Sequence, residues 1–282
     1  SPRFGERFND FYSTTDMGGG LILDGSTKSD VAQRYHNLRL SSDFFINKKN
    51  IVGVIISGLD RSGEDITDDN ITGNTLFRNG QIIEKTATSI DNSDMFRTWS
   101  GNINYTHTIK DGQEFTLNAD YGRYKTGQYS FQENLFTDNS GLPTREANIF
   151  RSNSDQVIEI ISAKADYEQI MFKNYKLEAG AKFARSLTDN NLLREDKIDG
   201  IWSPNQNLSS IFGYTENISA AYVSVARQFG PKWSLKAGLR GEMTDATGNW
   251  TSADTTTHKT YTDLFPTLFV GYTPNKDFRF GL

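Results

Sequence analysis

Few residues in this chain have the type and spacing needed for chemistry. The three histidines, His36, His107 and His258, lie far apart, and none stands at the short spacing to a second histidine or a carboxylate that a local metal site uses. We therefore predict three isolated surface histidines. The sequence names no catalytic residue, metal ligand or cofactor-binding residue, and we expect that the protein is not an enzyme.

Two further segments could bind ions. Residues 18–20 are three glycines, but they lack the spacing and the following Lys-Ser/Thr of a phosphate-binding loop, so we predict a flexible or bulged strand segment. An acidic segment could offer calcium the several oxygen ligands that it prefers. Its members are Asp60, Glu64, Asp65, Asp68 and Asp69. Their spacing matches no EF-hand, so we predict a solvated loop.

The composition favours strands and excludes a helical membrane protein. No stretch approaches the roughly 20 continuous apolar residues that a transmembrane helix needs. Aromatic residues make up 12% of the chain and there are only 6 prolines, which permits long strands. The chain has no cysteine and so no disulfide framework, which a closed barrel does not need. A net charge of −5 without a basic stripe argues against a nucleic-acid partner.

The sequence repeats a unit of long strand, short turn, long strand and long polar loop. The short turns are residues 47–50, 110–112, 172–174, 230–232 and 274–277. The polar loops are residues 61–95, 128–154, 188–213 and 247–259. Tight turns at one end and long loops at the other are typical of an outer-membrane β-barrel, whereas a soluble sandwich has short loops at both ends.

The expected strands alternate apolar and polar residues, as strands between lipid and a polar lumen do. They cover about residues 36–46, 51–60, 96–109, 113–127, 155–171, 175–187, 214–229, 233–246, 260–273 and a truncated strand from 278, with an earlier one near 17–24. One face of residues 233–243 carries Trp233, Leu235, Ala237, Leu239 and Met243, and the other carries Lys236, Arg240 and Glu242. The sequence therefore predicts an all-β fold: an antiparallel transmembrane β-barrel, present in part as about ten strands.

The polar faces of two strands supply the candidate inner wall. They carry Lys176, Glu178, Lys182, Lys236, Arg240 and Glu242. These charges could line a substrate path or contact a plug, or they could simply pair with one another in a wet lumen. No residue can be named as a substrate ligand.

Aromatic residues stand beside the short turns, where an interfacial girdle would lie. They are Phe44, Phe45, Phe115, Tyr167, Tyr175, Phe229, Trp233, Tyr272 and Phe278. Aromatic residues are also enriched in strands generally, so their presence alone does not indicate a girdle. The girdle interpretation rests on their position beside the short turns together with the difference in length between turns and loops.

Four segments resemble a known family. They are residues 42–53 (SDFFINKKNIVG), 214–222 (YTENISAAY), 237–242 (AGLRGE) and 261–268 (YTDLFPTL). Their order and spacing, over residues 36–282, look like the outer-membrane β-barrel of Bacteroidetes-type TonB-dependent receptors. The resemblance implies a barrel of about 22 strands in the bacterial outer membrane, occluded by an N-terminal plug and energised through TonB. Fewer than half of those strands and no plug are visible, and residues 277–282 begin a strand that stops short, so we expect a barrel fragment.

We expect residues 1–35 to be an N-terminal strand and loop segment of the barrel and residues 36–282 to be its transmembrane strands. The expected function is energised uptake of a nutrient such as a metal chelate or an oligosaccharide. The expected partners are outer-membrane lipid, the plug and the TonB system, with the substrate unknown. Two alternatives remain open: a non-transporting surface protein, such as an adhesin or scaffold, on the same barrel, and a soluble β-sandwich binding module.

Overall fold

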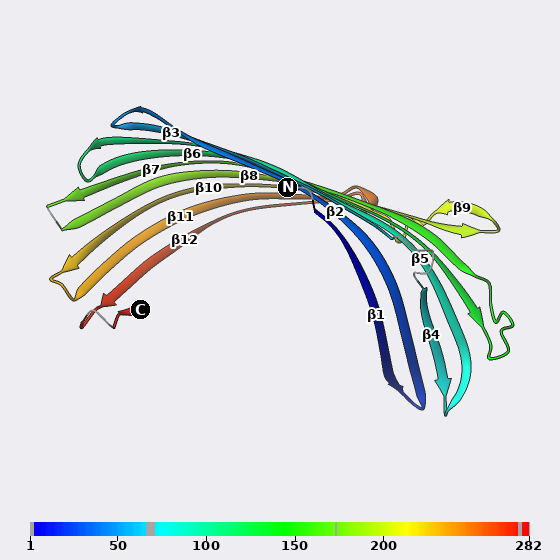
Figure 1. Cartoon of the computed structure of the whole chain (residues 1–282). Coiled ribbons are helices and arrows are strands. Elements are labelled where there is room, and N and C mark those ends of the chain that lie inside the picture. Colours follow the sequence, from blue (N-terminus) through cyan, green and yellow to red (C-terminus); the bar gives the residue numbers. More distant parts are fainter. Residues whose placement is uncertain (1–2, 66–70, 173, 276–277, 282) are drawn as a thin grey trace.

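The computed structural model describes residues 3–65, 71–172, 174–275 and 278–281, and in them the chain forms one antiparallel sheet of 13 strands (Figure 1). The strands are β1 (Arg3–Gly18), β2 (Leu21–Asn47), β3 (Asn50–Asp65), β4 (Ile71–Arg78), β5 (Gln81–Lys110), β6 (Gln113–Thr137), β7 (Asn148–Met171), β8 (Tyr175–Ile198), β9 (Ile201–Pro204), β10 (Ser210–Phe229), β11 (Trp233–Trp250), β12 (Thr255–Tyr272) and β13 (Phe280–Gly281). One short 3-10 helix, η1 (Thr251–Ala253), joins β11 to β12. The described part of the chain has no helix with the length and hydropathy needed to cross a membrane.

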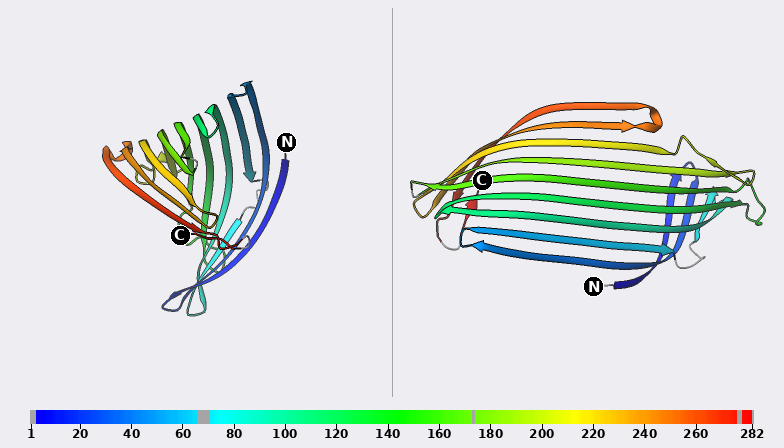
Figure 2. Two further views of the ribbon diagram at one scale, coloured as in Figure 1. Left: turned by 90° about the vertical axis from the view of Figure 1, so that its left-hand side faces the viewer. Right: turned by 90° about the horizontal axis from the view of Figure 1, so that it is seen from above.

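Neighbouring strands in the sheet follow the order of the sequence. The order is β1-β2-β3-β5-β6-β7-β8-β10-β11-β12-β13, with β4 paired to β2 and β5, and β9 paired to the end of β8. The sheet is twisted and curved, and β1, β2, β4 and β5 bend away from the other strands at one end (Figures 1 and 2). This sequential antiparallel pairing is that of an up-and-down barrel wall.

The connections at the two ends of the sheet differ in length, but less than the sequence predicts, because two-residue turns also join β1 to β2, β4 to β5 and β8 to β9 at the end where it predicts long loops. At one end, two residues join β2 to β3 and two join β5 to β6. Gly112 in the second of these turns and Gly230 in the β10–β11 turn have φ of +71° and +63°, which only glycine adopts readily. Longer connections, such as the ten residues between β6 and β7, lie at the other end. Residues 173, 276 and 277 of the predicted turns lie outside the described residues.

The predicted loops are wrong in extent, because most of their residues belong to strands. Residues 61–95 contain the end of β3, all of β4 and the first part of β5, and residues 188–213 contain the end of β8 and all of β9. The same holds for much of 128–154 and 247–259. Beyond the apolar band both faces of a strand can be polar, so the hydrogen-bonded ladder continues although the alternation of apolar residues stops.

The strand predicted near residues 17–24 is also wrong. Residues 19 and 20 form the turn between β1 and β2, and Gly18, Gly19 and Gly20 all have positive φ, from +61° to +80°. Three glycines stand here because a tight reversal needs backbone conformations that side chains disfavour. Part of the bulge prediction holds, since the β1–β2 register shifts between Asp16 and Gly18.

Strand register divides the side chains between two faces. We call the face that carries Lys236 and Glu178 the inner face and the face that carries Trp233 and Leu239 the outer face. Outer-face side chains are strongly exposed: Ile103 is 58% and Leu239 47% accessible. Among the described residues, Ala220 is the only buried apolar residue, so the sheet is a single layer. The sandwich alternative fails here, because it requires a second sheet packed on the apolar face.

Candidate functional site

A network of charged side chains covers the inner face near the short-turn end. The carboxylate of Glu178 on β8 accepts hydrogen bonds from Lys236 Nζ at 2.5 Å and from Ser224 Oγ at 3.1 Å, and it lies 3.0 Å from Lys176 Nζ. Lys176 also pairs with Glu168 at 2.8 Å. One carboxylate therefore links side chains of three adjacent strands, β8, β10 and β11.

A second cluster lies next to this network, and it can form because Gly180 has no side chain. The hydroxyl of Tyr222 on β10 donates a hydrogen bond to Asp166 on β7, and the Tyr222 side chain passes over Gly180 of the intervening β8. A Cβ atom at Gly180 would lie 2.5 Å from the Tyr222 ring and 2.7 Å from Asp166, so only glycine leaves room for this crossing. Lys164 Nζ pairs with Asp166 at 2.8 Å.

The two clusters line a hollow of about 620 Å³ in the inner face. All six predicted inner-wall charges lie on this face, and five of them are in ion pairs, including Arg240 with Glu242 at 2.7 Å. Lys182 forms no ion pair with a described residue. The wall can hold polar and charged groups by hydrogen bonding.

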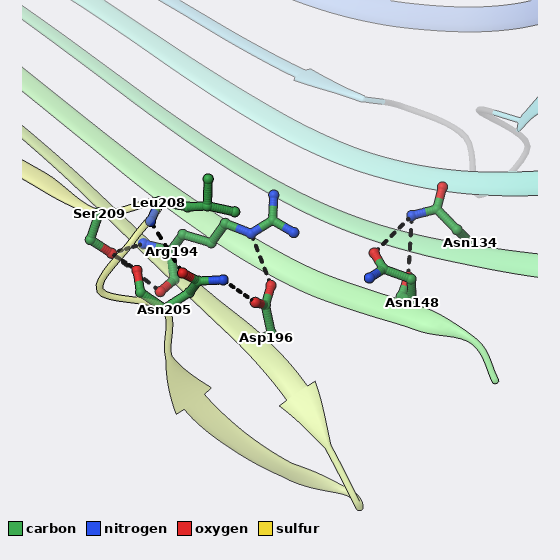
Figure 3. Close-up of polar contacts among 7 residues, drawn as sticks. All are labelled: Asn134, Asn148, Arg194, Asp196, Asn205, Leu208 and Ser209. Carbon is green, nitrogen blue, oxygen red and sulfur yellow. Dashed lines mark hydrogen bonds and ion pairs between the residues drawn. The ribbon is translucent and has the colours of Figure 1, made fainter.

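Beyond these clusters, at the long-loop end, a polar cluster fixes the connection from β9 to β10 (Figure 3). Asp196 on β8 accepts hydrogen bonds from Arg194 Nε at 2.9 Å and from the Asn205 amide at 2.5 Å. Asn205 Oδ1 in turn accepts one from the Leu208 amide N–H at 3.1 Å. Ser209 Oγ donates to the Asn205 carbonyl at 2.7 Å. These internal hydrogen bonds hold the connection from β9 to β10 in a defined shape at the long-loop end of the sheet.

This cluster predicts a pH response. Burial disfavours ionised Asp196, but the hydrogen bonds from Asn205 and Arg194 outweigh burial and lower the pKa of its carboxyl. A lowered folded-state pKa means that the stabilisation is present above the ordinary value of about 4 and is lost as the pH falls through the folded-state pKa. We expect amide hydrogen exchange in residues 205–209, corrected for its intrinsic pH dependence, to be flat from neutral pH to about 4 and to accelerate below it.

The matched variants are Asp196→Asn and, at the exposed β8–β9 turn, Asp199→Asn. Asp199 has a φ of +52°, which asparagine tolerates. Asp196→Asn should exchange fast at neutral pH and lose the acid step, whereas Asp199→Asn should behave as the unmodified protein. An acid step that survives in Asp196→Asn would assign the response to another group.

Aromatic side chains also gather on the inner face at this end. Phe212 and Tyr214 of β10 and Trp250 of β11 lie together, with ring centroids 4.4 Å apart for Phe212 and Trp250 and 6.5 Å apart for Phe212 and Tyr214. Flat aromatic faces exposed to a lumen can stack on planar or apolar parts of a solute. The sequence does not predict Phe212 and Trp250 as inner-face residues, because they lie in the predicted loops 188–213 and 247–259. The available signal was that Phe212 lies on the same face of β10 as Tyr214, at the two-residue spacing of a strand.

The three histidines lie apart from one another, and the sequence predicts that neither they nor the acidic segment binds an ion. His107 hydrogen-bonds Asn50 at 2.7 Å, and His258 lies 3.4 Å from Asp245 on the outer face. In the described ranges, no three His, Asp or Glu side chains are close enough to share a metal ion. Asp60 of the acidic segment pairs with Arg97 at 2.9 Å. Glu64 and Asp65 belong to β3, and Asp68 and Asp69 lie outside the described residues.

Comparison with known proteins identifies the class. The family model described as "Outer membrane protein beta-barrel family" matches residues 107–282, which is more than half of the chain. The chain therefore belongs to this family and is a protein of the bacterial outer membrane, as the sequence predicts. Its outer face is the one that meets lipid. No curated protein matches the chain.

A solved structure shows the same fold at low identity. The ferric citrate transporter FecA superposes with a TM-score of 0.59 and 13% identity, covering 99% of this chain and 41% of FecA. The siderophore receptor PiuA from Acinetobacter baumannii has a TM-score of 0.44 and 13% identity, covering 97% of this chain and 47% of PiuA. The ferric yersiniabactin uptake receptor FyuA from Yersinia pestis has a TM-score of 0.43 and 13% identity, covering 100% of this chain and 46% of FyuA. The chain thus spans less than half the length of these proteins.

Proposed function

We propose that this chain forms part of the barrel wall of a TonB-dependent receptor, of the Bacteroidetes type, that takes up a nutrient across the outer membrane. The observation that carries the proposal is the division of the sheet into two faces. The inner face holds an ion-paired network over β7, β8, β10 and β11, and the outer face is apolar. A wall of this kind encloses a polar passage in the membrane.

The parent protein would supply the rest of the receptor. In this proposal a plug closes a barrel of about 22 strands, and TonB provides the energy that opens it. The inner-wall network would contact the plug or the passing solute, and no bond of the solute is broken. A ferric chelate is the first substrate to test, because FecA is a ferric citrate transporter and shares the fold.

The test uses the parent protein in cells with TonB present or deleted. Uptake of radiolabelled ferric citrate and of a labelled oligosaccharide is measured, and crosslinking asks whether TonB contacts the parent protein. We expect a TonB crosslink, and uptake that requires both the parent protein and TonB. A parent protein that lies in the outer membrane but gives neither a crosslink nor uptake would favour the adhesin or scaffold alternative.

A further inference from the structure

The outer face ends in a row of charged and amide side chains at the long-loop end. On seven adjacent strands, this row begins just beyond the apolar residues. Its members are Asp60, Arg97, Arg123, Glu159, Arg185, Asn217 and Asp245. Apolar and aromatic residues such as Trp99, Tyr121 and Phe183 lie directly below. In a barrel with long extracellular loops, this row marks the level of the outer-leaflet headgroups.

Positive charge dominates the middle of the row. Four cations face outward on β5, β6 and β8: Arg97, Arg123, Lys125 and Arg185. Arg97 is paired with Asp60 at 2.9 Å and Arg123 with Glu159 at 3.1 Å. Lys125 and Arg185 have no ion-pair partner among the described residues. The middle of this row therefore has two cations without an ion-pair partner in the described part of the protein, and an anionic group could bind there.

An apolar hollow lies below these cations, beyond Tyr121 and Phe183. It has a volume of about 820 Å³, and its floor consists of small outer-face residues of β6, β7, β8 and β10: Ala119, Ala163, Ala165, Ala181 and Ala221. Larger side chains, including Leu117 and Phe183, stand at its margins. Ala181 and Arg185 are four residues apart on one strand, which is about 13 Å. A ligand that fills the hollow can therefore reach the cations.

We propose that the outer face of β5 to β10 binds a phosphate-bearing lipid of the outer leaflet. Its acyl chains occupy the alanine hollow, and its phosphate groups lie at Arg185 and at Lys125, on either side of Glu159, whose carboxylate is already paired with Arg123. Charge complementarity selects this occupant: the hollow takes hydrocarbon, and only a phosphate or a similar anion uses two unpaired cations above it. The inference depends on the membrane-facing outer face and not on transport.

The experiment measures lipid binding to the detergent-solubilised parent protein by native mass spectrometry. The probes are lipid A and the same lipid after enzymatic removal of its phosphates. We expect lipid A to bind at least about tenfold more tightly than the dephosphorylated lipid, as one lost charge-assisted contact implies. The double variant Lys125→Gln/Arg185→Gln should abolish the difference, and Lys110→Gln, at the opposite end of the band, should keep it.

The hollow has its own test. Ala181→Phe fills it from a lipid-exposed position and should weaken binding of both lipids, while the heat-modifiable gel shift shows that the barrel is folded. Inorganic phosphate at the lipid concentration should not compete, because it makes no use of the hollow. Equal binding of the two lipids, full competition by phosphate, or a co-purifying protein that protects Arg185 in place of lipid would each overturn the proposal.

Discussion

Replacing Ile103 by arginine is expected to destabilise the intact barrel by about 2 to 4 kcal/mol, the cost of a cation near the middle of the bilayer. Ile103 lies on the outer face of β5 and is 58% exposed in this single sheet. It pairs with Ala119 of β6, which lies four residues from Phe115, at the girdle beside the short turn, and four from Arg123, at the level of the headgroups. An arginine there has no inner-face acid within reach and must extend through hydrocarbon towards a headgroup.

The neighbouring residue provides the matched control. Asn102 lies on the inner face of the same strand and hydrogen-bonds Asp120 of β6, so Asn102→Arg places the same cation beside a carboxylate and in a wet lumen. We expect it to cost little. Leu239→Arg, on the outer face of β11, should repeat the large effect on another strand. Reversible folding of the parent protein into lipid vesicles, followed by denaturant titration, measures all three, and equal costs on both faces would contradict the assignment of the faces.

The strands that cross the membrane could be predicted because each of their two faces meets a different environment, which requires apolar and polar residues to alternate along the strand. In residues 175–187 and 233–243, lipid on one side and a polar lumen on the other force alternation at every second residue, and the observed register confirms both faces. The girdle follows the same rule for most of its members. Phe44, Phe115, Tyr167 and Trp233 lie on the outer face, but the register places Phe45 on the inner face.

The strands beyond the membrane could not be predicted in the same way. β4 and the first half of β5 are rich in Thr, Asn, Ser and charged residues, and both of their faces can meet water, so no hydrophobic period marks them. Their pairing is nonetheless extensive: β2 runs for 27 residues and pairs with β4 along one part and β3 along another. Backbone hydrogen bonds can form such ladders even where the side chains show no hydrophobic alternation.

The candidate site was predictable as a face but not as a set of contacts. Alternation alone put Glu178 and Lys236 on the inner wall. That Lys236 reaches Glu178 depends on the register of β10 between them, which brings together residues 58 apart in sequence. The Tyr222–Gly180–Asp166 crossing needs two registers at once. A glycine in the middle of an otherwise regular strand was the available signal, because such a residue often marks a close approach.

Gly180 is therefore where a small change should have a large effect. Its neighbours Ala179 and Ala181 face outward, while a side chain at Gly180 would point into the Tyr222 ring, 2.5 Å away. A substitution must push the ring aside and break its hydrogen bond to Asp166. Overpacking costs about 1 to 3 kcal/mol and a hydrogen bond to a charged acceptor about 1.5 to 3 kcal/mol. The two changes overlap, since one displaced ring causes both.

We expect Gly180→Val to destabilise the parent barrel by about 3 kcal/mol, measured by the same vesicle-folding titration. Gly101→Val is the control, since a Cβ there would meet only the Ile55 carbonyl at 3.9 Å and valine favours strands. In a Tyr222→Ala background the ring is gone, so Gly180→Val should cost much less, and the double-mutant cycle should give a coupling energy of about 1 kcal/mol or more. An unchanged cost in that background would show that Gly180 is required by the backbone and not by the ring that crosses it.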